Sequence, residues 1–259
     1  LNIMKKTIFL FFIFISSFIY GQEDYMLAER YYRDGKYEKA TQLFKVLLDK
    51  NPFNTTYLKR LISAYQETSQ FETVDKLLKQ RLITYPTHTY LYVELGYNYE
   101  KQQQKETAKI YYDKAINSIK TTTGMGGFIG RLFKDNALLD NAIMAYEETM
   151  RYNKSANYEF QIAQIYGEKG DFEKMFTSYI DLIDKNENYL NTVQRFTSRY
   201  ITDDRLNNTN ILFKKALIKK SVSNPKDVWN QLLSWLFIQQ KEYEKAFIQE
   251  KALFNRNPK

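Results

Sequence analysis

The residue types that most often carry out chemistry in proteins are scarce in this sequence. Cysteine is absent, and histidine occurs once, as His88. A transition-metal site needs several converging donors, which one histidine without cysteine does not supply. The lack of cysteine also excludes disulfides, thiolate nucleophiles and the lipid-bearing cysteine of a bacterial lipoprotein. We therefore expect no metal and no cofactor, and we interpret His88, beside Pro86, as a solvated turn residue.

Two other patterns could suggest catalysis. The segment GMGGFIG at residues 124–130 superficially resembles a dinucleotide-binding loop, but such a loop follows a β-strand in a βαβ unit. We interpret it instead as a flexible loop with Gly130 at a close-packing position. Paired acids such as Glu147 and Glu148 point about 100° apart on a helix and do not share a site. One histidine supports no Ser-His-Asp constellation, so the sequence predicts that the chain is not an enzyme.

We expect any functional surface of this chain to be formed by helices. With nine Gly and four Pro in 259 residues, the sequence lacks the turns that a many-stranded sheet requires. Its length allows two compact domains or one elongated one. Aromatic residues make up 16% of the chain, including 22 Tyr and 18 Phe. This is more than the core of a minimal helical bundle needs, and it predicts repeated stacking of large, flat side chains.

The first 21 residues are typical of an export signal. Lys5 and Lys6 precede an apolar run from Ile8 to Ile19, and Gly21 ends the run with a small residue. A membrane-spanning helix requires roughly 20 apolar residues, so cleavage is favoured over anchoring. Removal of this segment takes away two lysines and no acid, which lowers the formal net charge from +8 to about +6. We predict an exported protein, periplasmic or associated with the outer membrane.

A period of 34 residues runs through the sequence, which is the mark of a repeat architecture. It is visible in one series of small residues and one of tyrosines: Ala40, Val74, Ala108 and Ala142, and Tyr31, Tyr65 and Tyr99. In the first unit, Leu27, Ala28 and Tyr31 share a face of one expected helix, and Asp34-Gly35 marks a turn. A second expected helix ends before Pro52 and is lined by Tyr37, Ala40, Phe44 and Leu47.

These positions resemble the consensus of the tetratricopeptide repeat (TPR) family. The third unit carries the same pattern with Leu95, Gly96, Tyr99, Ala108 and Tyr112. The resemblance implies an all-α, right-handed superhelical solenoid of about seven helical hairpins, each packing on the next. The units are expected near residues 22–54, 55–88, 89–122, 123–155, 156–189, 190–226 and 227–259, the sixth being degenerate with a second helix at about 209–222.

TPR arrays end in a helix with a polar outer face, whereas this sequence ends at Pro258-Lys259, directly after a consensus hairpin. We expect the array to continue beyond the given chain. Stacking of two copies through the uncapped C-terminal hairpin is the alternative.

The resemblance also implies a binding scaffold whose inner surface, formed by the first helix of each hairpin, holds a protein or peptide partner. Tyrosine suits such a surface because it offers a large contact area with few rotamers to order. A clamp for a C-terminal carboxylate is not expected, because Ser63, Tyr90 and Glu94 stand where its polar and basic residues would be. The residues predicted for the inner surface are Tyr25, Glu29, Tyr32, Lys59, Ser63, Tyr90, Tyr97, Phe160, Gln164 and Trp235.

Lysines cluster in the sixth unit, at positions 214, 215, 219 and 220. They form either a solvated helix face or a surface attracted to an acidic partner or an anionic envelope, which salt dependence would separate. Export argues against nucleic acid. Membrane contact is expected only through partners or a downstream segment.

The leading functional hypothesis is a non-catalytic scaffold of the bacterial cell envelope. The composition and the signal ending in Gly21-Gln22 resemble those of Bacteroidota proteins. The alternative is a sensory ectodomain of a longer membrane-bound signalling protein. A downstream apolar run of about 20 residues would favour that alternative.

Overall fold

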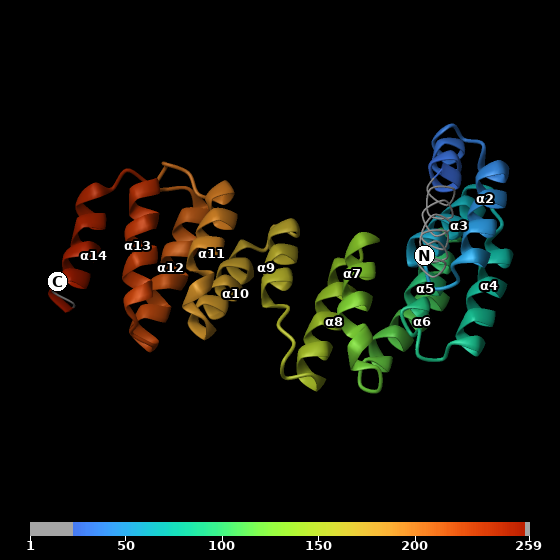
Figure 1. Cartoon of the computed structure of the whole chain (residues 1–259). Coiled ribbons are helices and arrows are strands. Elements are labelled where there is room, and N and C mark those ends of the chain that lie inside the picture. The colour runs from blue at the N-terminus through green and yellow to red at the C-terminus, as the bar shows by residue number, and fades with distance from the viewer. Residues whose placement is uncertain (1–22, 257–259) are drawn as a thin grey trace, which may run out of the picture. The chain divides into compact units, whose positions relative to one another are not determined.

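A computed structural model describes residues 23–256 of the chain. The predicted export signal and Pro258 lie outside the described residues. Within them all regular structure is helical, which confirms the all-α prediction (Figure 1). The helices are residues 23–33, α2 (Tyr37–Lys50), α3 (Thr55–Glu67), α4 (Phe71–Thr84), α5 (Leu91–Lys101), α6 (Lys105–Ser118), α7 (Gly126–Asp135), α8 (Leu139–Tyr152), α9 (Glu159–Glu168), α10 (Phe172–Lys185), α11 (Leu190–Thr197), α12 (Asn208–Ser223), α13 (Asp227–Gln239) and α14 (Tyr243–Arg256).

The chain divides into two compact units, Leu1–Ser118 and Ile119–Lys259. The described part of unit 1 holds helix 23–33 and α2 to α6. Unit 2 holds α7 to α14 together with three short 3-10 turns at Thr123–Met125, Glu187–Tyr189 and Ser198–Tyr200. In both units most successive helices pair as hairpins, for example α5 with α6 and α7 with α8, whereas α11 and α12 each pack on α10 and α13 instead of on one another.

Most of the hairpins turn in the same way. One residue at the turn takes a left-handed backbone conformation, with φ from 56° to 75°, at Gly35, Ser69, Gln103, Ala137, Gly170 and Lys241. The next backbone N–H bonds back to an aromatic residue near the end of the first helix, as from Lys36 to the carbonyl of Tyr31 at 2.8 Å and from Gln70 to that of Tyr65 at 2.8 Å. This is the hydrogen bond of a Schellman cap. The recurring tyrosines therefore mark helix ends as well as packing positions.

Small residues let the two helices of a hairpin approach. Sixteen positions after each stands a large ring: Phe44 follows Ala28, Tyr112 follows Gly96 and Tyr146 follows Gly130. A Cβ added at Gly96 would lie 2.3 Å from the Tyr112 ring, and one at Gly130 2.5 Å from the Tyr146 ring. Glycine is needed there because the helices leave no room for a methyl group.

The expectation of a flexible loop at 124–130 is wrong. After a 3-10 turn at Thr123–Met125, α7 begins at Gly126. A Cβ at Gly126 would lie 2.0 Å from Thr149, and one at Gly127 would lie 2.0 Å from the Tyr158 hydroxyl. The glycines are helical because neighbouring side chains occupy the space that a larger residue would fill.

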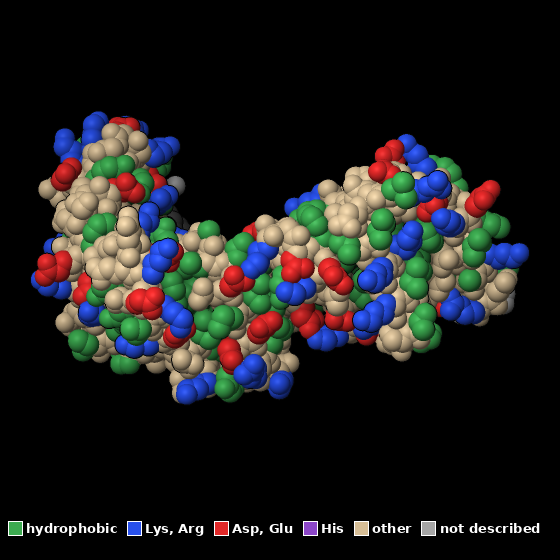
Figure 2. Space-filling model, turned by 180° about the vertical axis from the view of Figure 1, so that it is seen from behind, with side chains coloured by type: hydrophobic (Ala, Val, Ile, Leu, Met, Phe, Trp, Pro, Cys, Tyr) green, Lys and Arg blue, Asp and Glu red, His purple; other side chains and the backbone are tan. Residues whose placement is uncertain are grey.

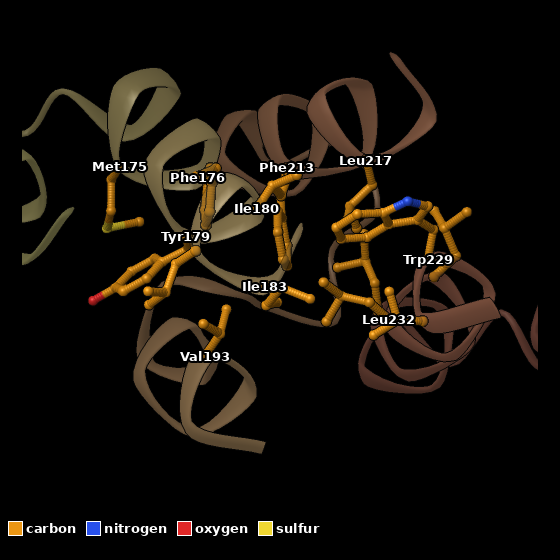
Figure 3. Close-up of a cluster of buried hydrophobic side chains, with 14 of the residues drawn as sticks. Met175, Phe176, Tyr179, Ile180, Ile183, Val193, Phe213, Leu217, Trp229 and Leu232 are labelled. Atoms are coloured by element: carbon orange, nitrogen blue, oxygen red, sulfur yellow. The ribbon is translucent and has the colours of Figure 1, made fainter. Parts of the chain in front are cut away.

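The core of unit 2 gathers residues from α10, α11, α12 and α13 (Figure 3). Phe176 and Phe213 stack with ring centroids 4.5 Å apart, and Trp229 is fully buried and donates from its indole nitrogen to the Asn224 carbonyl at 2.8 Å. This core replaces the regular packing in the degenerate sixth hairpin, where α11 has only eight residues.

The loop that interrupts the sixth hairpin is held by one buried amide. Asn210 is fully buried, and its side chain donates to the carbonyls of Thr202 at 2.8 Å and Asp204 at 2.7 Å. Asn207 caps the following helix by accepting from the Thr209 backbone N–H at 3.0 Å. The helix that follows, α12, runs from Asn208 to Ser223, within one residue of the bounds 209–222.

Candidate protein-binding surface

Helix 23–33 and α3 present a cluster of rings and charges in unit 1, which we call the Tyr/Arg60 cluster: Tyr25, Glu29, Tyr32, Tyr57, Arg60 and Ser63. At its centre, the Arg60 Nε lies 2.6 Å from a Glu29 carboxylate oxygen. The Arg60 guanidinium also lies over the Tyr32 ring, 5.5 Å from its centroid. The rings of Tyr25 and Tyr57 lie 5.5 Å apart. All these side chains are half-buried, so the cluster forms a shaped and accessible surface.

The electrostatics keep the tyrosines of this cluster as hydrogen-bonding phenols. Burial raises the pKa of Tyr25, and the Glu29 carboxylate adds to this while Arg60 opposes it. Burial likewise raises the pKa of Tyr32, with the Glu67 charge adding to it. Both hydroxyls are therefore protonated at neutral pH. They can donate to and accept from a partner's backbone.

The structure brings four of the predicted residues together: Tyr25, Glu29, Tyr32 and Ser63. Lys59 lies one turn from Ser63, whose hydroxyl donates to the Lys59 carbonyl at 3.0 Å. Tyr57 and Arg60 belong to the cluster but were not predicted. Arg60 could have been predicted from the sequence, because it lies in the hairpin after that of Glu29 and carries the opposite charge.

The prediction that Tyr90 lines the inner binding surface is wrong. Its side chain is only 6% exposed, so it does not line an open surface. It immediately precedes α5, lies 5.5 Å from the His88 ring, and has a pKa raised mainly by burial. The chain folds the Tyr90 ring inward at the connection between hairpins.

The expectation that His88 is a solvated turn residue is also wrong. Its ring is half-buried and stacks on Tyr85 at 5.1 Å, with the Phe53 ring at 6.0 Å. Among the described residues, its buried Nδ1 has no hydrogen-bond partner. Burial lowers the pKa of His88, and the charge of Arg81 lowers it further. His88 therefore belongs to a ring cluster that joins two neighbouring connections.

The remaining predicted residues divide between surface and core. Tyr97 is half-buried, with the Lys101 ammonium 5.4 Å from its ring centroid, and Gln164 is half-buried on α9. Phe160 and Trp235 instead pack against the unit 2 core. The Phe160 ring lies 4.8 Å from Phe196 and 5.7 Å from Tyr179, and the Trp235 ring lies 6.4 Å from Phe213. These two side chains mainly stabilise unit 2.

No group of three or more His, Asp or Glu side chains comes together as a metal site in the part of the chain that the structure describes. What the Tyr/Arg60 cluster offers is contact area, phenolic hydroxyls and one guanidinium. These groups are suited to binding.

The hairpin formed by α5 and α6 matches the family model of the tetratricopeptide repeat over residues 89–121. This hairpin is a tetratricopeptide repeat. The hairpins that turn at Gly35, Ser69 and Ala137 keep the 34-residue spacing and the left-handed turn of the matched one, and those that turn at Gly170 and Lys241 keep the left-handed turn. TPR repeats generally mediate protein–protein interactions, and TPR proteins are generally interaction scaffolds.

Solved TPR structures resemble the chain at low identity. The C-terminal part of a TPR protein from Cytophaga hutchinsonii is 16% identical, with 90% of this chain and 95% of that one covered and a TM-score of 0.37. A TPR protein from Parabacteroides merdae is 13% identical, with 90% and 91% covered and a TM-score of 0.35. A thermophilic TPR protein from Thermus thermophilus is 17% identical, with 69% and 97% covered and a TM-score of 0.36. No curated protein sequence matches the chain.

Proposed function

We propose that this TPR protein is a non-catalytic scaffold of the bacterial cell envelope. It holds a peptide or protein segment on the Tyr/Arg60 cluster of unit 1. The observation that carries the proposal is the grouping of Tyr25, Tyr32 and Tyr57 around the Glu29–Arg60 ion pair, on the first helices of two consecutive hairpins.

The chemistry of the cluster supports an extended or helical polypeptide as the occupant. Tyrosine rings provide area at little entropic cost, and their hydroxyls can pair with backbone N–H and carbonyl groups. Arg60 is 39% exposed, whereas its partner Glu29 is 17% exposed. The guanidinium can therefore reach a carbonyl or carboxylate of the partner and keep its contact with Glu29. Tyrosine and arginine are the residues most often found at the energetic centre of interfaces.

The test uses site-specific photocrosslinking from residues 22–259. A photoreactive side chain replaces Tyr32 in one version and Val46, 46% exposed on α2, in the other. In envelope extracts, we expect a discrete crosslinked polypeptide from position 32 and none from position 46. Mass spectrometry then identifies the crosslinked segment, which is synthesised for a direct binding measurement.

Arg60→Ala should weaken binding of that segment by about tenfold or more, as for a residue near the centre of an interface. Ile83→Ala, at a residue 73% exposed on α4, should leave it unchanged. Equal binding by the Arg60 variant and the unaltered chain would remove the Tyr/Arg60 cluster as the site. An apolar run of about 20 residues encoded downstream would turn the same scaffold into the ectodomain of a membrane protein.

A further inference from the structure

Among the described helices of ten residues or more, α12 is the one without an acidic residue. Its 16 residues, NTNILFKKALIKKSVS, contain four lysines. Its apolar residues are spread around the helix, so that one set faces the core and another faces solvent. Phe213 and Leu217 are fully buried, whereas Ile211, Ile218 and Val222 are 40%, 47% and 77% exposed. Phe213 and Leu217 pack in the core. Core packing does not explain why the three exposed residues are apolar.

Four exposed residues of α12 form one stripe, which we call the α12 stripe: Ile211, Lys215, Ile218 and Val222. Their spacings of four, three and four residues place them on a single helix face. The stripe is about 16 Å long. Lys214 flanks it on one side and Lys219 on the other. An apolar line with lysines along and beside it is the pattern of a helix that lies in a membrane interface.

The lysines in and beside the α12 stripe form no direct ion pair within the described residues, although Lys215 and Lys219 share a groove lining with Glu173 and Asp181. Lys220 points to the other side of α12 and bonds Asp181 at 3.0 Å and Asp184 at 2.6 Å. Within the described structure, Lys214, Lys215 and Lys219 have no carboxylate at ion-pair distance. Figure 2 shows Lys and Arg side chains gathered beside hydrophobic ones over unit 2. The stripe is therefore a local source of positive potential next to apolar surface.

A groove of about 270 Å³ runs beside the stripe, between α10 and α12. Its lining includes Glu173 and Asp181 from α10 opposite Lys215 and Lys219 from α12. The two walls balance each other's charge, so the groove itself does not select an anion. The apolar residues of the stripe, Ile211, Ile218 and Val222, do not line this groove. A flat anionic surface fits the stripe better than a single acidic chain lying in the groove.

We propose that the α12 stripe binds the surface of an anionic phospholipid bilayer. Ile211, Ile218 and Val222 enter the boundary between headgroups and acyl chains. The stems of Lys214, Lys215 and Lys219 extend along it, so that their ammonium groups reach the lipid phosphates. This peripheral contact is direct, unlike the expectation that membranes are met only through partners or a downstream segment. No described helix is long and apolar enough to cross a bilayer.

The test is vesicle flotation of residues 22–259, which include all the described residues. One set of vesicles contains phosphatidylglycerol and phosphatidylcholine in equal parts, and the other contains phosphatidylcholine alone. We expect binding to the anionic vesicles only, and weaker binding as salt rises because exposed charges are screened. Since each interfacial lysine contributes about a fivefold factor, Lys214→Glu, Lys215→Glu and Lys219→Glu together should reduce partitioning by about a hundredfold or more.

Helix α6 supplies a matched control. It also carries three exposed lysines, Lys105, Lys109 and Lys114, but it contains Glu106 and Asp113, and Lys109 pairs with Asp113 at 2.8 Å. Changing those three lysines to Glu should leave vesicle binding unchanged. Ile218→Asn with Val222→Asn should weaken binding without altering charge. Circular dichroism and the fluorescence of Trp229 and Trp235 verify that unit 2 stays folded in each variant.

Four outcomes would overturn the proposal. They are no binding to anionic vesicles at low salt, equal binding by the α12 and α6 lysine variants, full binding by the Ile218 and Val222 variant, and binding to soluble polyglutamate but not to vesicles. The last outcome would assign the stripe to an acidic protein instead. None of these outcomes involves the Tyr/Arg60 cluster, so the two proposals fail separately.

Discussion

Aromatic residues on the first helices of the hairpins have different roles in the two units, although they occupy comparable repeat positions. In unit 1, Tyr25 and Tyr32 lie at the surface with Arg60 and Glu29 between them. In unit 2, Phe160 and Trp235 close over the hydrophobic core. All four rings are partly buried, so the two units differ in what the rings contact: charged groups in unit 1 and the apolar core in unit 2.

The chemistry of the rings explains part of this difference. A tyrosine hydroxyl loses hydrogen bonds to water when buried, so half-burial beside charged groups is favourable for it. Phe160 and Trp235 gain more by excluding water. The degenerate sixth hairpin is a second reason why rings pack on the core of unit 2. Its Phe213 ring stacks on Phe176, and the pair offers a larger apolar surface for other rings to cover.

The largest expected effect tests the core of unit 2. Phe213→Ala removes a fully buried ring and should lower the free energy of unfolding by about 3–5 kcal/mol. Both tryptophans of the chain, Trp229 and Trp235, lie in unit 2, so urea unfolding followed by their fluorescence reports on this unit. Phe247→Ala, at a residue 67% exposed on α14, is the control and should change little. An unchanged midpoint for Phe213→Ala would contradict the assigned core.

A paired substitution tests the comparison directly. Phe160→Ala should destabilise unit 2 by about 1–3 kcal/mol, since the ring is partly buried against Phe196 and Tyr179. Tyr32→Ala should cost unit 1 less than about 1 kcal/mol, because its ring contacts lie at the surface. Circular dichroism in urea measures both variants. Equal losses at the two positions would remove the distinction between the units.

The hairpin turns should behave alike in both units. Gln103 in unit 1 and Ala137 in unit 2 hold left-handed conformations with φ of 62° and 60°. Replacing either with Gly should stabilise the chain by about 0.5–1 kcal/mol, because the strain relieved exceeds the added entropy of the unfolded chain. Thermal unfolding measures the gain. The reverse change, Gly35→Ala at φ 72°, should destabilise, and a gain there would contradict the argument.

The smallest effect is a pH dependence carried by the one histidine. The folded pKa of His88 lies below its ordinary value of about 6.5, so above that value the ring is neutral in both states and stability is full. As the pH falls through 6.5, the unfolded chain takes up the proton first, and stability declines. Urea unfolding by circular dichroism between about pH 8 and 5.5 should show this slope, and His88→Asn should flatten it. An identical slope in the variant would assign the dependence to other groups.

How far the sequence predicts the fold can be judged from particular positions. The spacing of Tyr31, Tyr65 and Tyr99 predicts the hairpins, because a helix end and its cap are formed by residues close together in the chain. The bounds of α12 followed from the same local patterns. The glycines at 126 and 127 were misassigned, because what requires them is contact with Thr149 and Tyr158, more than twenty residues away.

For the binding surface, the predictable part was the orientation of first-helix residues such as Tyr25, Glu29, Tyr32 and Ser63. The exposure of each residue was not predictable. Tyr90 is buried, and Phe160 and Trp235 are partly buried because they pack against residues from other hairpins. The pairing of Arg60 with Glu29 likewise needs two helices brought together.

By itself, the sequence determined that the chain is all-helical, built of hairpins at a 34-residue period, and turned and capped in a repeating way. These features depend on contacts within about one hairpin, where periodicity and capping act. Only the tertiary structure decided that the array forms two compact units, that half-buried tyrosines surround the Glu29–Arg60 ion pair in unit 1, and that α12 exposes apolar residues beside lysines. Burial and ion pairing are sums over neighbours from distant parts of the chain, and those neighbours are set by folding.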